Sequence, residues 1–245
     1  RDSPSSIPYL NIDSVDYCTF GNSKPFRIKI RNIVNDNFTY FYVKKTDASR
    51  VYGIEFEHML SPRNLNFLVN NSSLIEEHIA GIPGDIFIED YLPKCTELQK
   101  SQIAKEYVKF NERCMIRLLG DMRAYNYVVV PTHDFDQVVY KIRPIDFDQQ
   151  SFEGKFSVYR PQFFKENTPI MDLVRTKLNH DSINQYKYKA AGCSDEDGLA
   201  RLGRAGDRHL SHHGALLLAL GARLPAKRCA RAFHRLPAMP GREPD

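Results

Sequence analysis

The sequence contains no run of apolar residues long enough to cross a bilayer, and its longest candidate is the short stretch 215–220. This argues against a membrane-spanning protein. Cysteine is scarce: there are five cysteines in 245 residues, and no two are spaced as a CxxC pair. Their odd number and wide spacing argue against a disulfide framework or a zinc site. They favour a reducing compartment, so we expect a cytoplasmic protein.

A strong excess of charge is also missing. The formal net charge is +4, which is too small to indicate a nucleic-acid-binding protein. The hydrophobic fraction of 42% and the charged fraction of 26% are ordinary for a globular protein. At 245 residues the chain is long enough for one large domain or two small ones, and its core needs no covalent staples.

The composition changes sharply near residue 190. All 13 tyrosines lie before this point, in a region rich in Asn, Ile, Lys and Phe. From Ala190 to Asp245 there is no Ile, Val, Tyr, Asn, Thr or Gln, and Ala, Arg, Gly, Leu and Pro take over. We therefore expect residues 190–245 to be a poorly ordered tail of foreign sequence, derived from a frameshift or from a vector. A natural low-complexity extension is the alternative. One helix is expected in this tail, near residues 213–220.

The region before the tail begins with strands. Residues 26–33 alternate apolar and basic side chains, which is typical of a half-exposed strand. Residues 38–45 are rich in β-formers, and an Asn-Asp-Asn turn signal lies between the two stretches. We expect an antiparallel hairpin here. It should be followed by a helix over 50–60, short strands over 66–69 and 73–79, and a break at Gly81, Pro83 and Gly84.

Beyond this break the pattern changes to helices. A short helix is expected over 85–92. Residues 96–119 carry apolar side chains at steps of three and four, which predicts a long helix that Gly120 ends. Short strands are expected over 126–131 and 137–142, and another helix over 169–178. The fold class is therefore α+β, with a small β-rich lobe over 1–80, a helical lobe over 81–189 and the tail over 190–245.

Polar residues suited to phosphoryl transfer follow the long helix. Asp121 and Asn126 form an Asp-x4-Asn pair at its exit, and Asp146 comes directly after a strand, in Ile-Asp-Phe-Asp. Phosphoryl transfer needs a carboxylate beside the acceptor hydroxyl and oxygen ligands that hold Mg²⁺ against the nucleotide phosphates. Taken singly, Asp121 could cap a turn and Asp146 could end a strand. The order of all three along the chain is what indicates this chemistry.

Residues 119–126, Leu-Gly-Asp-Met-Arg-Ala-Tyr-Asn, resemble the catalytic loop of the protein kinase-like superfamily. Residues 145–148 resemble its metal-binding Asp-Phe-Gly segment, or the Ile-Asp-x-Asp variant of that segment. The resemblance is nearest to the aminoglycoside and choline phosphotransferase branch and covers residues 26–178. It implies a two-lobed protein kinase-like fold that binds ATP and Mg²⁺.

The resemblance also implies roles for single residues. Asp121 would be the catalytic carboxylate, and Arg123 would lie beside the transferred phosphate. Asn126 and Asp146 would bind Mg²⁺, and Asp148 is near enough in sequence to share the metal. A second Asp-Phe-Asp stretch, residues 134–136, is too close to Asn126 and lies in a turn, so we do not assign it to the site.

The strand over 38–45 resembles the one that carries the phosphate-binding lysine of the family. Alternation places Val43 and Lys45 on one face, which favours Lys45, and Lys44 is the alternative. The glutamate that orients this lysine would be Glu57, or else Glu55.

Residues 74–81 resemble the hinge between the two lobes. There, backbone groups of Glu77 and Ile79 would meet adenine. The side chains at such a hinge matter little, because the contact is made by the main chain.

The chain also departs from the family pattern. No Gly-rich loop precedes the lysine strand, Leu119 stands where His is usual, and there is no Ala-Pro-Glu segment. The function we expect is an ATP- and Mg²⁺-dependent phosphotransferase that moves the γ-phosphate to a hydroxyl of a small molecule or protein. The alternative is a pseudokinase-like module that binds nucleotide or protein without turnover. We expect neither nucleic acid nor a membrane as a partner.

Overall fold

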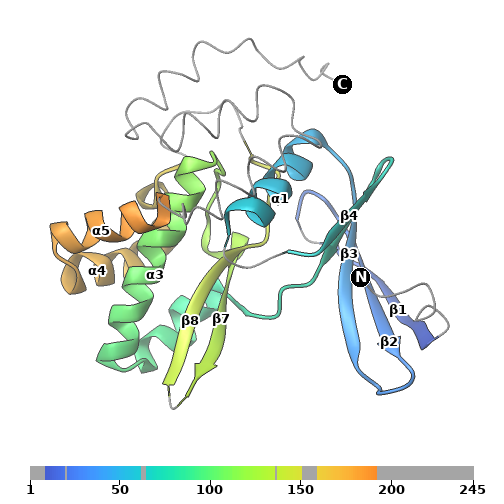
Figure 1. The fold of residues 1–245 in the computed structure, drawn as a ribbon, viewed down its shortest axis with the longest axis horizontal. Coiled ribbons are helices and arrows are strands. Elements are labelled where there is room, and N and C mark those ends of the chain that lie inside the picture. The colour runs from blue at the N-terminus through green and yellow to red at the C-terminus, as the bar shows by residue number, and fades with distance from the viewer. Residues whose placement is uncertain (1–8, 20, 62–64, 136, 151–158, 192–245) are drawn as a thin grey trace, which may run out of the picture.

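The computed structural model describes residues 9–19, 21–61, 65–135, 137–150 and 159–191. The described chain is a mixed α/β protein, with an antiparallel sheet in its N-terminal part and helices after it (Figure 1). The predicted tail lies almost wholly outside the described residues, as does the helix expected near 213–220.

The N-terminal sheet has five strands in the order β1-β2-β3-β5-β4, and every neighbouring pair is antiparallel. Its strands are β1 (Leu10–Tyr17), β2 (Phe26–Asn32), β3 (Phe38–Lys45), β4 (Phe67–Asn70) and β5 (Ser73–Glu77). Tight turns join consecutive strands at Asp36 and Asn71, which have φ of 56° and 51°. Asp and Asn tolerate this left-handed conformation better than other non-glycine residues, which explains the turn signals in the sequence. Strand β1 was not predicted.

Helix α1 (Ala48–Leu60) crosses from the sheet toward the C-terminal part of the chain (Figure 1). Asp47 caps its N-terminus, because the side chain accepts a hydrogen bond of 2.8 Å from the backbone N–H of Arg50. A Cβ atom on Gly53 would lie 2.8 Å from Cβ of Phe147. Glycine at this point therefore lets the helix approach the segment that follows the last strand.

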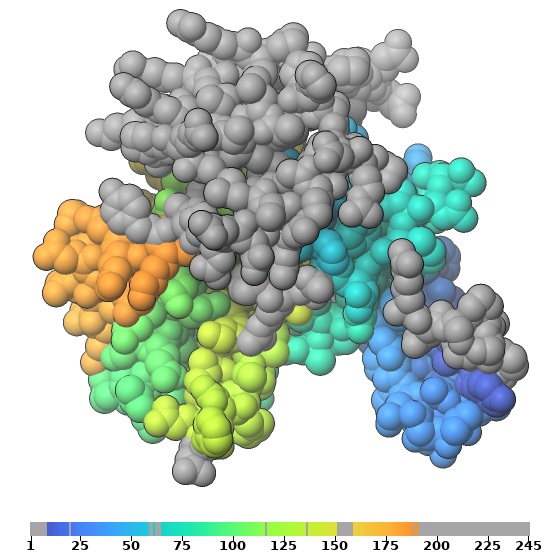
Figure 2. Space-filling view, in the orientation of Figure 1, coloured from blue at the N-terminus to red at the C-terminus, as the bar shows by residue number. Residues whose placement is uncertain are grey.

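A second, three-stranded sheet underlies the C-terminal part, in the order β6-β7-β8. Its strands are β6 (Ile82–Pro83), β7 (Tyr127–Asp134) and β8 (Gln137–Pro144). Helix α2 (Gly84–Ile86) follows β6 and continues into a π-helical turn over Phe87–Tyr91 and a 3-10 turn over Leu92–Lys94. Figure 2 shows open space between the β7–β8 hairpin and the strands β1–β3 on this face of the molecule.

Helix α3 (Glu97–Ile116) is the long predicted helix, and α4 (Thr168–Lys177) and α5 (His180–Ala191) pack against it. A capping box between Thr96 and Gln99 fixes its start. The prediction that Gly120 ends this helix was wrong. The last helical residue is Ile116, and the chain turns away through Leu118, whose φ is 56°. Helix α5 was not predicted.

The main hydrophobic core joins both sheets to α1 and α3. Each of its large side chains contributes about 1.5–3 kcal/mol through removal of apolar surface from water. Its most buried large apolar members are Ile54, Leu74, Phe87, Ile103, Phe110, Leu119, Tyr127, Phe147 and Ile170. Within the described residues, no helix combines the length and the apolar character that a membrane span requires.

Candidate functional site

The loop after α3 forms a closed unit around Asp121. The side-chain amide nitrogen of Asn126 donates to the backbone oxygen of Asp121 at 2.7 Å and to its carboxylate Oδ2 at 3.3 Å. Asp121 has φ of 54°, a strained conformation for a non-glycine residue that these bonds help to hold. Because the amide nitrogen of Asn126 is used in this way, its carbonyl oxygen is the atom that could bind a cation.

The acidic segment 145–150 runs beside this loop. The backbone N–H of Ile145 donates to the oxygen of Asn126 at 3.0 Å, and that of Gly120 donates to Gln149 at 3.2 Å. Leu119 and Gln150 form an isolated antiparallel bridge between the same two stretches. The structure thus brings Asp121 and Asn126 into one region with Asp146 and Asp148, although Asp146 lies 20 positions after Asn126 in the sequence.

The carboxylates of this region influence one another. Burial, and then the nearby charge of Asp146, raise the pKa of Asp148, and the charge of Asp121 acts in the same direction. Arg50 of α1 opposes these effects, with its Nη2 atom 3.8 Å from Oδ2 of Asp148. Three acidic groups therefore share one electrostatic environment, which favours a cation or a cationic ligand.

Arg123 belongs to the same loop. Its Nε donates to Oδ1 of Asp121 at 3.0 Å, and its guanidinium lies over the ring of Phe164, 5.2 Å from the centroid. A second carboxylate, that of Glu166, is 3.9 Å from Nη1. Arg123 is therefore a direct partner of Asp121.

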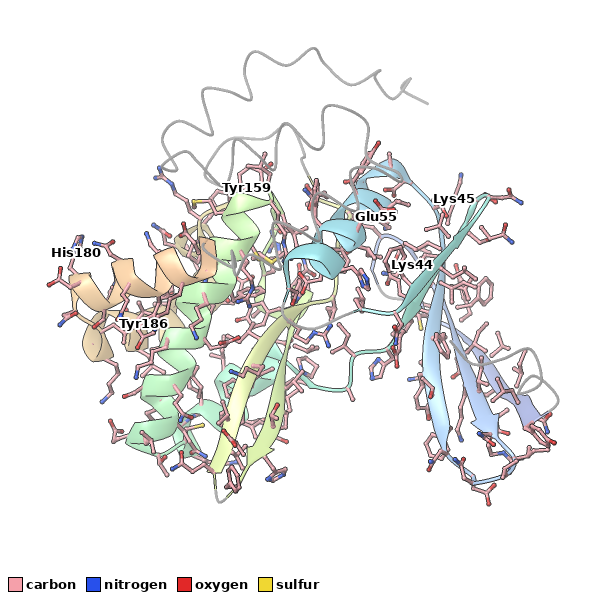
Figure 3. All side chains as sticks on the ribbon, in the orientation of Figure 1. Lys44, Lys45, Glu55, Tyr159, His180 and Tyr186 are labelled. Atoms are coloured by element: carbon pink, nitrogen blue, oxygen red, sulfur yellow. The ribbon has the colours of Figure 1, made fainter. Side chains whose placement is uncertain are left out.

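The lysine that points toward the interior is Lys44. Its Nζ lies 2.7 Å from Oε2 of Glu76 on β5, and both side chains are buried, at 8% and 7% exposure. Lys45, the residue favoured by sequence, is exposed at the end of β3, and alternation puts it on the opposite face of the sheet (Figure 3).

Glu76 also links the sheet to the acidic segment. Burial raises its pKa, the charge of Lys44 opposes this rise, and the charge of Asp146 adds to it. The Asp146 carboxylate is thus close enough to the Lys44–Glu76 pair to act on its ionisation. Lys44, and not Lys45, is therefore the lysine that lies near the acidic segment.

Glu57 is occupied elsewhere. Its buried carboxylate pairs with the buried guanidinium of Arg117, and the backbone oxygen of Arg117 accepts a hydrogen bond from the Gln150 side chain. Burial lowers the pKa of Arg117 to about 9, which still leaves it cationic at neutral pH. The ion pair expected between Glu57 and the strand lysine is thus replaced by one that fastens α1 to the end of α3.

The alternative glutamate, Glu55, is half-buried on α1 and borders a shallow hollow (Figure 3). Asp121, Asp146 and Asp148 are not among the residues that line this hollow. Its walls are Thr46, Asp47, Ala48, Val51, Tyr52, Glu55 and Asn71.

The predicted hinge is the connection from β5 to β6. The backbone N–H of Glu77 donates to Asn66 at 3.0 Å, and that of His78 donates to Tyr40 at 2.8 Å. Ile79 is partly buried against the main core. Because the N–H of Glu77 is already bonded, its carbonyl and the backbone of Ile79 are the groups that could meet a base.

The second Asp-Phe stretch lies far out on the β7–β8 hairpin. Asp134 ends β7, and Phe135 in the turn has φ of 49° and a fully exposed side chain. An exposed hairpin tip offers no partners for phosphate or metal. Residue 136 lies outside the described part of the chain.

The oxygen donors of the site suit magnesium. Within the described residues, no cluster of three His, Cys, Asp or Glu side chains is arranged to hold a metal ion on its own. The Asn126 carbonyl and the Asp146 carboxylate are a typical protein contribution to a Mg²⁺ ion whose other ligands are phosphate oxygens and water. The donor set therefore fits a magnesium ion that arrives with a phosphate chain.

Sequence reasoning missed Glu76, Arg50 and Ser49, which connect the site to its surroundings. For Glu76, the register of β3 against β5 provides a signal that identifies it. Leu74 pairs with Lys44 across the β3–β5 ladder, and Glu76 lies two residues further along β5, on the same face.

Comparisons with known proteins give little further guidance. No protein-family model matches the sequence, and no curated protein matches it. Among solved structures, the chain is similar to the crystal structure of Rad53 residues 1–466 in complex with AMP-PNP, with a TM-score of 0.40 and 14% sequence identity. The match covers 93% of this chain and 64% of that chain, and a TM-score this low does not assign a fold.

Proposed function

We propose that this chain has a two-lobed kinase-like fold, binds ATP with Mg²⁺, and transfers the γ-phosphate to a hydroxyl group of a small molecule or protein. The observation that carries the proposal is the bonding of the Asp121–Asn126 loop alongside segment 145–150. This arrangement collects one amide and three carboxylates from distant parts of the chain at a single place. An ordinary structural loop has no need of so many acidic groups in one partly buried region.

Each residue has a role that its surroundings support. Asp121 would orient the acceptor hydroxyl and take its proton, while Asn126 and Asp146 hold Mg²⁺. Lys44 would contact the nucleotide phosphates from the sheet. The bound metal would neutralise charge on the phosphates, and the residues of the chain would supply mainly position and electrostatic stabilisation.

Arg123 completes this set. It neutralises the Asp121 carboxylate through the 3.0 Å bond from Nε. When a phosphate is near, the same guanidinium can turn toward it, because phosphate binds guanidinium at least as well as a carboxylate does. The role we assign to Arg123 is contact with the phosphate in transfer.

A second function, nucleotide binding without turnover, is favoured by one specific observation. Both carboxylate oxygens of Asp121 already accept hydrogen bonds, Oδ1 from Arg123 and Oδ2 from Asn126. Both oxygens are thus occupied by donors of the protein itself, which leaves the carboxylate less available to an acceptor hydroxyl. The missing Gly-rich loop points in the same direction.

The test is a thermal shift followed by a turnover assay. Mg·ATP should raise the melting temperature, ATP without Mg²⁺ should raise it less, and release or transfer of labelled γ-phosphate should follow. Asp172→Asn, a substitution of the same kind on the exposed face of α4, is the matched control for Asp146→Asn. Binding without turnover selects the second function. No shift with Mg·ATP rules out both.

A further inference from the structure

The Lys44–Glu76 ion pair lies entirely within one sheet. Lys44 and Glu76 belong to neighbouring antiparallel strands, and their Nζ and Oε2 atoms are 2.7 Å apart in a buried setting. The other carboxylate oxygen of Glu76, Oε1, is buried and has no hydrogen-bond partner among the described residues. The polar contact of the Glu76 carboxylate is therefore the one between Oε2 and Lys44.

Helix α1 is fastened to a different part of the molecule. Glu57 pairs with Arg117 at the end of α3. The hydroxyl of Ser49 bonds to the backbone oxygens of Asp148 and Gln150, each at 2.9 Å. The polar contacts that fix α1 thus point to the C-terminal part, while Lys44 is fixed by the sheet.

We propose that Glu76, and not Glu57 of α1, is the residue that positions Lys44 for phosphate contact. The proposal rests on the proposed nucleotide-binding function. A lysine held by a neighbouring strand stays in place when a helix moves, because the ladder of backbone hydrogen bonds fixes the spacing between strands. The phosphate contact is then ready before any ligand arrives.

The ion pair is tested without nucleotide by competitive labelling. The whole chain is treated with a trace of acetic anhydride, and mass spectrometry reads the label at Lys44 against that at exposed Lys45. In the parent, Lys44 should react more slowly. In Glu76→Gln it should react several-fold faster relative to Lys45, because the Lys44 amine is then no longer held in the buried 2.7 Å ion pair and can reach the reagent. In Glu57→Gln the ratio should stay at the parent value.

The opposite pattern would overturn the proposal: faster labelling of Lys44 in Glu57→Gln and parent-like labelling in Glu76→Gln. If Glu76→Gln does not fold, Glu76→Asp serves in its place, since it keeps the charge but withdraws it by one methylene. An intermediate ratio is then expected, and a parent-like ratio counts against the proposal. If Glu57→Gln does not fold, Glu57→Gln/Arg117→Met removes both charges together.

Nucleotide is then added to separate the two proposals. Mg·ATP should protect Lys44, but not Lys45, from acetylation. A lack of protection in a parent whose Glu76 response is intact counts against the proposed function and leaves the positioning of Lys44 supported. In turnover, Lys44→Met combined with Glu76→Gln should be no slower than Lys44→Met alone, since Glu76 acts through Lys44. An additive loss of kcat would show that Glu76 acts independently of Lys44.

Discussion

The amide nitrogen of Asn126 holds Asp121 by two bonds, one to its backbone oxygen at 2.7 Å and one to its carboxylate at 3.3 Å. The position of the carboxylate is thus fixed by a side chain at the other end of the same loop. This arrangement allows the charge of Asp121 to be changed while the loop geometry is kept, because Asn126 can still donate to the backbone oxygen.

Asp121→Asn should leave Mg·ATP affinity close to that of the parent, since the role we propose for this residue is contact with the acceptor hydroxyl and not with the metal. Turnover should fall by about 10²–10⁴, the range for loss of a positioned general base. Isothermal titration and a γ-phosphate assay measure the two effects. Turnover equal to that of Asp172→Asn would remove Asp121 from the mechanism.

Asp146→Asn should weaken Mg·ATP binding and abolish measurable turnover. A carboxylate and a triphosphate repel each other unless a cation lies between them, and the amide removes the charge that holds that cation. Mg²⁺ titration of ATP affinity measures this. Asp148→Asn is measured separately, because its carboxylate also lies near Arg50, and a loss equal to that in Asp146→Asn indicates that both residues share the metal.

Glu57→Gln should reduce the free energy of unfolding by about 3–5 kcal/mol, since it leaves the buried Arg117 charge without its partner. Chemical denaturation gives the value. Glu57→Gln/Arg117→Met should recover part of the loss, because the unpaired charge is gone. A loss that the second substitution does not relieve would contradict the buried-pair explanation.

Two glutamates of α3 should respond to pH in opposite directions. Burial raises the pKa of Glu112 above 4.5, so its contribution to stability is complete below that pH and is lost as pH rises through the folded-state pKa. Hydrogen bonds from Lys177 and Lys100 lower the pKa of Glu97, so its contribution is present above 4.5 and is lost as pH falls.

Urea unfolding from about pH 4 to about pH 7 measures both effects as slopes of stability against pH. Glu112→Gln should make this slope more positive than that of the parent, and Glu97→Gln should make it more negative. Each variant is the control for the other, because both remove a glutamate from the same helix. Equal changes of slope in the two variants would contradict this prediction.

Gly84→Ala should be poorly tolerated. A Cβ at this position would lie 2.2 Å from the Tyr127 ring and 2.3 Å from the backbone oxygen of Ala124, which belongs to the Asp121–Asn126 loop. We expect a loss of at least about 1–3 kcal/mol from overpacking, together with lower nucleotide affinity. Gly21→Ala is the control: its φ is 78°, but a Cβ there meets nothing within 4 Å, so only backbone strain is expected.

Much of the fold could be predicted from local pattern. The β3 bounds 38–45 were predicted to the residue, because alternation and aromatic content mark both ends of that strand. Strand β1 was missed because an irregularity of register between Ile12 and Ser14 breaks the alternation of its apolar side chains. The strand is also stabilised by ion pairs to Arg27, Lys29 and Arg31 on β2. Such cross-strand pairs depend on register, which a single stretch of sequence does not reveal.

For the site, the sequence was sufficient to select some residues and not others. The Asp121 and Asp146 motifs could be found because spacing along the chain is enough to recognise them. The choice between Lys44 and Lys45 depended on which face of β3 turns inward, and the pairing with β5 decides that face. The partner of Glu57 depended on the end of α3, where Arg117 enters the core, and no sequence signal marks that contact.

Helix α1 is joined to the acidic segment 145–150 by the bonds from Ser49 to Asp148 and Gln150 and by the close approach of Gly53 to Phe147. We treat helix and segment as one unit. Lys44 belongs to the other unit, the five-stranded sheet. Within the described residues, short connections at 46–47 and 78–81 join the two units. If the proposed nucleotide site opens, these connections would bend, and the distance from Lys44 to Asp146 would measure the degree of opening.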